Sequence, residues 1–190
     1  MPSIVVVGTS LGGLAALTHL LEALPANFPV PLAIVQHRGK SDDDALVRLL
    51  GSLTSLAVCE PNDKEPLEPG RVYLAPADYH LLIERECIAL STAPPRQFAR
   101  PSIDLLFESA AESHGRGALA VLLTGSNNDG AAGCRQVKAR GGRVFVEDPA
   151  TAHSSAMPAS AIAAGAADVV LPLPQLCERL VAACAKPAPS

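Results

Sequence analysis

A serine lies between two glycines directly after the first apolar run of the chain, in the segment Gly8-Thr9-Ser10-Leu11-Gly12. Four apolar β-branched residues, Ile4 to Val7, precede this segment and predict a buried strand, and leucines at helical spacing follow it. Ser10 is therefore expected in a sharp turn, at the carboxyl end of a strand and the amino end of a helix. Open α/β sheets bind their ligands at such turns, where backbone N–H groups favour negative charge.

Two kinds of chemistry fit a turn of this composition. A Gly-rich turn between strand and helix most often holds a phosphate. However, Ser10 replaces the second glycine of the dinucleotide pattern, and Leu14 and Ala15 stand where a P-loop has Lys and Ser or Thr. The segment matches Gly-x-Ser-x-Gly instead, in which the serine is exposed as a nucleophile. A serine hydrolase is the favoured hypothesis, and a nucleotide- or phosphate-binding regulatory domain that uses the loop from Gly8 to Gly13 is the alternative.

A serine nucleophile needs a base, and the chain has five histidines. His37 directly follows Leu32–Gln36, a second apolar run that predicts a strand. This strand is expected beside the first in a parallel sheet, so His37 and Ser10 should emerge at the same sheet edge. The other histidines are predicted in helices, in a hairpin and in a late loop: His19, His114, His80 and His153. His37 is therefore the candidate base.

Asp129 is the candidate acid, because it follows the apolar run at residues 118–123 and should also lie at the carboxyl edge of the sheet. Its place before Gly130 and an Ala-rich helix predicts a second role, as the N-cap of that helix. The two roles are compatible, since a capping contact would hold the carboxylate rigidly. A triad needs three side chains from separate elements, with the acid fixing the tautomer of the histidine. Ser10, His37 and Asp129 meet that requirement.

Strand and helix patterns alternate in both halves of the chain and predict how these residues are positioned. The first part of the chain, up to Cys59, is predicted as strand–helix–strand–helix–strand, and the alternation resumes after Ser102. We therefore expect a doubly wound, mostly parallel sheet in a Rossmann-like three-layer α/β sandwich. Three short apolar runs between these halves are too close together for helical crossovers and predict an antiparallel edge hairpin or meander: residues 71–75, 79–85 and 87–91. One domain over residues 1–190, with a frayed tail at 186–190, is expected.

Composition narrows the function classes. Hydrophobic residues make up 48% of the 190 residues, enough for a sizeable core. A formal net charge of −4 and an aromatic content of 3% argue against nucleic-acid binding. No apolar run reaches membrane-spanning length, and the N-terminus lacks the basic segment of a signal peptide. The five cysteines form no C-x-x-C, so we expect reduced thiols in a soluble, cytoplasmic protein.

Six short blocks follow one another along the chain: residues 8–13, 34–37, 73–80, 100–104, 123–131 and 157–158. Taken in this order, they resemble the CheB family, the chemotaxis protein-glutamate methylesterases. The resemblance extends from Ile4 to Val170 and therefore covers nearly the whole chain.

The resemblance implies a serine esterase that hydrolyses γ-glutamyl methyl esters of chemoreceptors and deamidates selected receptor glutamines. Ser10 would be the nucleophile, His37 the base and Asp129 the orienting acid. No cofactor or metal is expected. The implied partners are methylated cytoplasmic helices of chemoreceptors and, because the family's usual receiver domain is missing from this sequence, a separate receiver or chemosensory protein. The oxyanion and substrate loops would be formed by Leu11, Gly12, Gly125, Ser126 and Asn127.

Three positions depart from the family pattern. Leu11 stands where the family usually has Thr, Arg38-Gly39 replaces Met-Pro, and Ser126-Asn127 replaces Met-Gly. We expect these changes to alter substrate preference and rate more than reaction type. A scaffold that has kept the fold and lost the chemistry is the further possibility that Leu11 and Ser126 raise.

Overall fold

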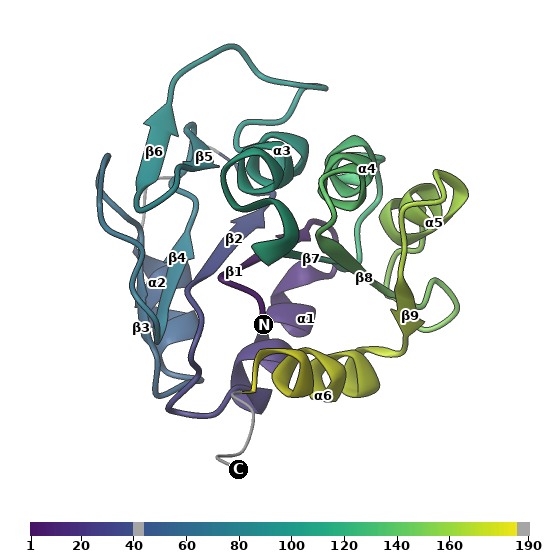
Figure 1. The fold of residues 1–190 in the computed structure, drawn as a ribbon, viewed down its shortest axis with the longest axis horizontal. Coiled ribbons are helices and arrows are strands. Elements are labelled where there is room, and N and C mark those ends of the chain that lie inside the picture. Colours follow the sequence, from purple (N-terminus) through teal and green to yellow (C-terminus); the bar gives the residue numbers. More distant parts are fainter. Residues whose placement is uncertain (40–43, 186–190) are drawn as a thin grey trace.

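The structure is a computed structural model that describes residues 1–39 and 44–185. The tail predicted to fray, residues 186–190, lies outside the described residues. Strands and helices alternate along most of the chain (Figure 1). The strands are β1 (Ile4–Thr9), β2 (Leu32–Gln36), β3 (Ala57–Cys59), β4 (Arg71–Leu74), β5 (His80–Ile83), β6 (Ile88–Ser91), β7 (Ala118–Leu122), β8 (Arg143–Glu147) and β9 (Val169–Leu171). The helices are α1 (Gly13–Ala23), α2 (Ala45–Gly51), α3 (Ile103–His114), α4 (Ala131–Ala139), α5 (Ala156–Ala163) and α6 (Leu173–Cys184), with a short 3₁₀ turn at Gly115–Gly117.

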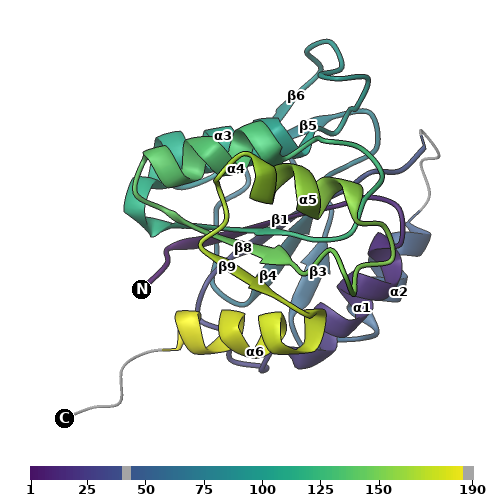
Figure 2. The same cartoon turned by 90° about the vertical axis from the view of Figure 1, so that its right-hand side faces the viewer.

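Seven of the strands form one parallel sheet in the order β3-β4-β2-β1-β7-β8-β9. Helices α3, α4 and α5 cover one face, and α1, α2 and α6 cover the other (Figure 2). This arrangement confirms the predicted doubly wound α/β sandwich. None of the helices in the described ranges is long and apolar enough to cross a membrane.

The four β-branched residues of β1 explain why this strand lies in the middle. Ile4 and Val6 belong to the core beneath α3 and α4, whereas Val5 and Val7 belong to the core beneath α1 and α6. All four are fully buried, and burying each such side chain stabilises the fold by about 1.5–3 kcal/mol. Alternation along a strand sends successive side chains to opposite faces, so a strand covered on both faces must be apolar throughout.

The register of the central strands brings the predicted site residues together. β1 pairs with β2 on one side, where Thr9 lies opposite Gln36, and with β7 on the other, where Gly8 lies opposite Leu122. The loops after β1, β2 and β7 therefore leave the sheet at one edge.

The predicted hairpin exists, but its placement differs from the expectation. β5 and β6 pair antiparallel as a separate two-stranded sheet that packs against α3, not at the edge of the main sheet. β4, expected in the same meander, lies between β3 and β2 as a parallel strand. The physical reason is that Val72, Tyr73 and Leu74 are fully buried. The chain crosses from β3 to β4 through the loop at residues 60–70 without a helix.

Candidate active site

Ser10 lies in a tight turn between β1 and α1. Its N–H donates to the carbonyl of Thr124 at 2.9 Å, and its own carbonyl accepts from the N–H of Gly13 at 2.9 Å. Gly12 precedes α1 with φ of 81°, a left-handed conformation that favours glycine. A Cβ at Gly12 would also lie 2.6 Å from the Cβ of His153. Gly12 thus permits the turn that carries Ser10 out of the sheet.

Side chains from β2 and from the loop after β7 hold the carbonyl groups of this turn. The Gln36 amide donates to the carbonyls of Ser10 at 2.9 Å and of His37 at 2.8 Å, so one side chain ties the two loops together. The hydroxyl of Thr124 donates to the carbonyl of Leu11 at 2.8 Å. Because these carbonyls are held, the peptide planes of the turn cannot reorient freely about φ and ψ.

Four backbone N–H groups beside Ser10 have no acceptor among the described residues: those of Leu11, Gly12, Ser126 and Asn127. The N–H of Gly125, by contrast, donates to the carbonyl of Ser154 at 3.1 Å. The N–H of Gly125 is therefore engaged within the fold, and the place of Gly125 in the oxyanion and substrate loops stays a prediction. Its small size has a different reason, because a Cβ there would collide with the side chain of Met157.

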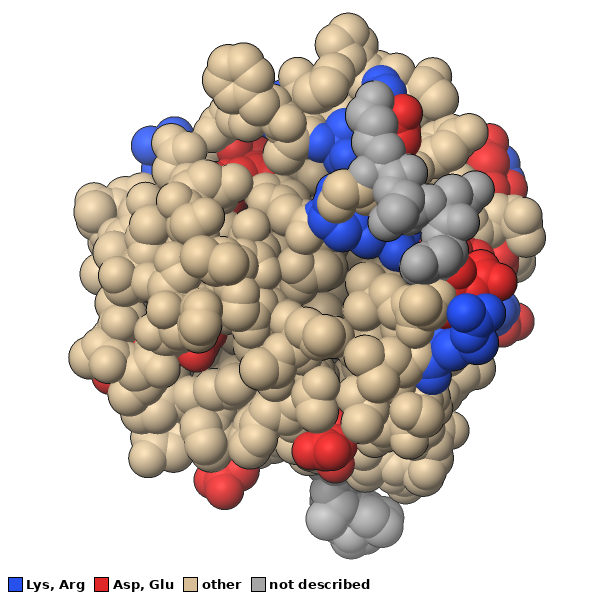
Figure 3. All heavy atoms as spheres, turned by 180° about the vertical axis from the view of Figure 1, so that it is seen from behind, with Lys and Arg blue, Asp and Glu red and all other residues tan. Residues whose placement is uncertain are grey.

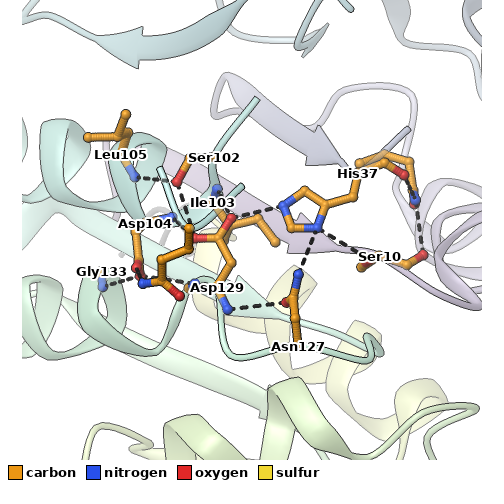
Figure 4. Close-up of polar contacts among 12 residues, drawn as sticks. Ser10, His37, Ser102, Ile103, Asp104, Leu105, Asn127, Asp129 and Gly133 are labelled. Carbon is orange, nitrogen blue, oxygen red and sulfur yellow. Dashed lines mark hydrogen bonds and ion pairs between the residues drawn. The ribbon is translucent and has the colours of Figure 1, made fainter. Parts of the chain in front are cut away.

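Ser10, His37 and Asp129 form a continuous hydrogen-bonded chain (Figure 4). The Nδ1 atom of His37 lies 3.2 Å from the Ser10 hydroxyl, and its Nε2 atom lies 2.8 Å from the Asp129 carboxylate. Asp129 can only accept, so Nε2 carries the proton and Nδ1 presents its lone pair to the serine. The side chain of His37 is 14% exposed and that of Asp129 is 1% exposed. A base thus contacts a serine on one side and a buried acid on the other.

The Asp129 carboxylate is held by the N-terminus of α3. The N–H of Ile103 donates to Oδ2 at 2.8 Å, the N–H of Asp104 donates to Oδ1 at 2.9 Å, and the Ser102 hydroxyl donates to Oδ1 at 3.1 Å. Burial alone would raise the pKa of Asp129, but the hydrogen bonds from His37 and from these backbone groups outweigh it and lower the pKa below its ordinary value. Asp129 is therefore the charged member of the group.

The predicted N-cap role of Asp129 is wrong. Gly130, a residue without a side chain, is the N-cap of α4. The N–H groups of Gly130 and Gly133 instead donate to the carboxylate of Asp104, at 2.9 and 2.7 Å. Asp129, which precedes α4, thus accepts hydrogen bonds from the N-terminus of α3. Asp104, in the first turn of α3, accepts hydrogen bonds from the N-terminus of α4. Anions are stabilised in such positions by the free N–H groups and the helix dipole.

A depression of about 800 Å³ opens beside Ser10 and His37. Leu11, Gly12, Ser126 and His153 also line it, and a neighbouring cavity of about 370 Å³ reaches His37 and Asn127 from the other side. Leu11 and Leu14 in the larger depression are 54% and 44% exposed. Seen from behind, the molecule shows a broad area with few charged side chains, and most of the visible Lys and Arg lie to one side of it (Figure 3). The site is therefore open and partly apolar, and it can admit a side chain of a larger partner.

Three supporting residues were missed by sequence reasoning. Gln36 and Asp104 position the site as described above, and both lie in blocks that carry the family resemblance, which was the available signal. His80, placed only in a hairpin by the sequence, is fully buried, and its Nδ1 accepts from the N–H of Ser102 at 3.2 Å. Its Nε2 lies 3.2 Å from the carbonyl of Pro94. In the described ranges no three His, Cys, Asp or Glu side chains are grouped to hold a metal ion.

Comparison with known proteins agrees with this geometry. A family described as CheB methylesterase matches residues 5–180. A putative protein-glutamate methylesterase/protein-glutamine glutaminase of Leptospira interrogans is 42% identical over 93% of this chain and 92% of that protein. A protein-glutamate methylesterase/protein-glutamine glutaminase of Anaeromyxobacter dehalogenans is 42% identical, but the chain spans only 51% of its length.

A solved structure extends the comparison to the fold. The crystal structure of the Thermotoga maritima CheB methylesterase catalytic domain superposes with a TM-score of 0.92 at 37% identity, over 96% of this chain and 99% of that one. The family match favours the hydrolase hypothesis for the Gly-rich loop over the phosphate-binding alternative. Because the family matches residues 5–180 and the fold agrees with that of the solved domain, this chain belongs to the CheB methylesterase family.

Proposed function

We propose that this chain hydrolyses γ-glutamyl methyl esters of chemoreceptor proteins, with Ser10 as the nucleophile, His37 as the base and Asp129 as the orienting acid. The observation that carries the assignment is the hydrogen-bonded chain from the Ser10 hydroxyl through both ring nitrogens of His37 to Asp129. Its first contact, at 3.2 Å, is slightly long, as is common when no substrate is bound.

Acyl transfer to Ser10 follows from this geometry. The oxygen of Ser10 bonds to the ester carbonyl carbon, its proton moves to Nδ1 of His37, and the carbonyl π electrons move onto the carbonyl oxygen. The imidazolium that forms is stabilised by the buried, ionised Asp129 at Nε2. The proton on Nδ1 then passes to the leaving oxygen, methanol departs, and Ser10 carries the glutamyl acyl group.

The N–H groups of Leu11, Gly12 and Ser126 are the candidate donors to the oxyanion. They have no acceptor among the described residues, and all three residues line the depression beside Ser10. One donor of this kind is worth about 3 kcal/mol of transition-state stabilisation.

Hydrolysis of the acyl-enzyme uses the same groups in reverse. His37 removes a proton from water, the hydroxide attacks the acyl carbon, and Ser10 recovers its proton. The names of the Leptospira and Anaeromyxobacter relatives also include a glutaminase activity. We extend this activity to the chain, since an amide can follow the same steps with ammonia as the leaving group.

The proposal implies a protein substrate in the cytoplasm. Methylated glutamate side chains on the cytoplasmic helices of chemoreceptors would enter the open depression, whose exposed Leu11 and Leu14 suit the apolar part of a helix. A separate receiver or chemosensory protein is the proposed regulator.

Methanol release from a methylated receptor fragment tests the proposal. The purified chain should release methanol, and Ser10→Ala should abolish the release while its circular-dichroism melt stays close to that of the wild type. Ser52→Ala is the matched control, because it makes the same change at an exposed serine at the end of α2. Methanol release that survives in Ser10→Ala would rule out Ser10 as the nucleophile.

A further inference from the structure

The side chain of Asn127 contacts the same nitrogen of His37 as Ser10 does. Its Nδ2 atom lies 3.3 Å from Nδ1 of His37, and the Ser10 hydroxyl lies 3.2 Å from that atom (Figure 4). The other end of the amide is also held, since Oδ1 accepts from the N–H of Asp129 at 3.1 Å. Asn127 therefore bridges the base and the backbone of the acid.

These two contacts fix which way the amide faces. Turning it over would place Oδ1 against the lone pair of Nδ1 and the NH₂ group against the N–H of Asp129, so both contacts would become repulsive. The NH₂ group must therefore face His37 and the Ser10 hydroxyl.

The lone pair of Nδ1 cannot serve two donors through the reaction. Nε2 donates to Asp129, so Nδ1 is the acceptor in the resting enzyme, shared by Ser10 and Asn127. When the Ser10 proton arrives on Nδ1, this atom becomes a donor and can no longer accept from Asn127. The amide loses its acceptor at the moment when negative charge forms on the substrate carbonyl oxygen beside Ser10.

We propose that Asn127 is a catalytic residue, whose side-chain amide transfers its hydrogen bond from Nδ1 of His37 to the oxyanion during acyl transfer. This inference rests on the proposed function. The step is the one described above: as the oxygen of Ser10 bonds to the carbonyl carbon, the carbonyl π electrons move onto the carbonyl oxygen, and the serine proton goes to His37. A hydrogen bond made only in the transition state accelerates the chemical step without tightening substrate binding. Leu11, next to the nucleophile, offers no side-chain donor, so Asn127 supplies one from the facing loop.

If Asn127 only supported the turn, a different set of variants would lose activity than if its amide took part in catalysis. The bond from the N–H of Asp129 to Oδ1 resembles an Asx turn, which a serine at the same position can form with its hydroxyl. Asn127→Ser keeps a turn acceptor and removes the amide, whereas Asn127→Ala removes both. Asn128→Ser is the matched control: the same substitution at the neighbouring exposed asparagine, whose side chain makes no hydrogen bond within the described part of the chain.

The test measures kcat and KM for methanol release from the methylated receptor fragment. We expect Asn127→Ser and Asn127→Ala to lose about 10²–10³-fold in kcat with KM within about twofold, and Asn128→Ser to stay within about twofold of the wild type in both. A second measurement needs no substrate: the ¹⁵N resonance of His37 Nδ1 in the free enzyme should move in Asn127→Ser and stay in place in Asn128→Ser.

Several outcomes would overturn the role of Asn127. They are an Asn127→Ser enzyme with near-normal kcat, a rise in KM alone, or an Nδ1 resonance that does not respond. Loss of activity only in Asn127→Ala, together with a lower melting temperature, would reduce Asn127 to a turn residue. A wild-type enzyme without turnover would overturn the proposed function as well, which separates the two failures.

Discussion

Asp104 and Asp129 occupy two similar regions of the molecule, the facing N-termini of α3 and α4. Both side chains are almost completely buried, at 0% and 1% exposure. Asp129 accepts two backbone N–H groups from the N-terminus of α3, and Asp104 accepts two from the N-terminus of α4. Each also accepts a side-chain donor, Gln97 at 3.1 Å for Asp104 and Ser102 at 3.1 Å for Asp129. The two carboxylates thus differ little in desolvation or in the number of backbone donors.

Their pKa values nevertheless shift in opposite directions, and the contact with His37 is the main difference. Burial raises the pKa of Asp104, helped by the negative charge of Asp129, despite the hydrogen bond from Gly133. At Asp129, burial acts in the same direction, but the hydrogen bond from His37 and the backbone donors reverse it. A helix N-terminus therefore holds each carboxylate in place, and the hydrogen bond from His37 lowers the pKa of the one that lies beside it.

Asp129→Asn should have the largest effect, because it changes the one carboxylate that contacts the base. Turnover should fall by about 10⁴-fold if His37 loses its tautomer, as in the serine proteases. Stability should fall by about 1–3 kcal/mol, because each oxygen of Asp129 accepts a backbone N–H and an amide NH₂ group in either orientation would face one of them. Methanol release and urea unfolding, followed by circular dichroism, measure the two effects.

Asp104→Asn is the matched control for this variant. Its Oδ1 can keep both backbone donors, so its turnover should stay within about tenfold of the wild type. Equal losses of turnover in the two variants would show that the carboxylates act only as helix supports.

The convergence of Ser10, His37 and Asp129 could be predicted from the sequence, because each residue follows an apolar run that becomes a central strand. Neighbouring parallel strands end at one edge, so Ser10, His37 and the loop that carries Asp129 had to converge. The crossed arrangement, in which Asp104 accepts from the N-terminus of α4 and Asp129 from that of α3, could not be predicted in this way. An aspartate in the first turn of a helix, or just before one, reads as a cap of its own helix, and only the packing of α3 against α4 reveals the partner.

The fold shows a similar limit at β4. The sequence rule that parallel strands need a helical crossover excluded residues 71–75 from the main sheet. The loop at residues 60–70 makes this connection without a helix, and burial of Val72, Tyr73 and Leu74 stabilises the strand in its place. The sequence also could not predict which ring nitrogen of His37 faces Ser10, because this depends on the side-chain direction that the contact with Asp129 sets.

Asp104→Ala should have a smaller effect on turnover than Asp129→Asn and should lower stability. Removing the carboxylate leaves the buried N–H groups of Gly130 and Gly133 without an acceptor, which costs about 2–3 kcal/mol. Turnover should fall by up to about 10²-fold through displacement of the Asp129 loop. Urea unfolding should rank the variants as Asp104→Ala below Asp104→Asn. Equal stability of these two variants would contradict the part assigned to the Asp104 oxygens.

The smallest effect, and the sharpest test of the comparison, is the pH dependence of stability. The folded-state pKa of Asp104 lies above its ordinary value near 3.8, so the folded state binds this proton more tightly than the unfolded chain. Its contribution to stability is fully present below that value and is lost as pH rises through the folded pKa. The pKa of Asp129 is lowered, so its contribution is present above 3.8 and is lost as pH falls through the folded pKa.

The free energy of unfolding of the wild type minus that of Asp104→Asn should therefore decrease with rising pH, whereas the same difference for Asp129→Asn should decrease with falling pH. The chain has no tryptophan, so urea titrations followed by circular dichroism between about pH 3 and pH 6.5 are the suitable measurement. Two differences that slope in the same direction would show that His37 does not distinguish the two carboxylates.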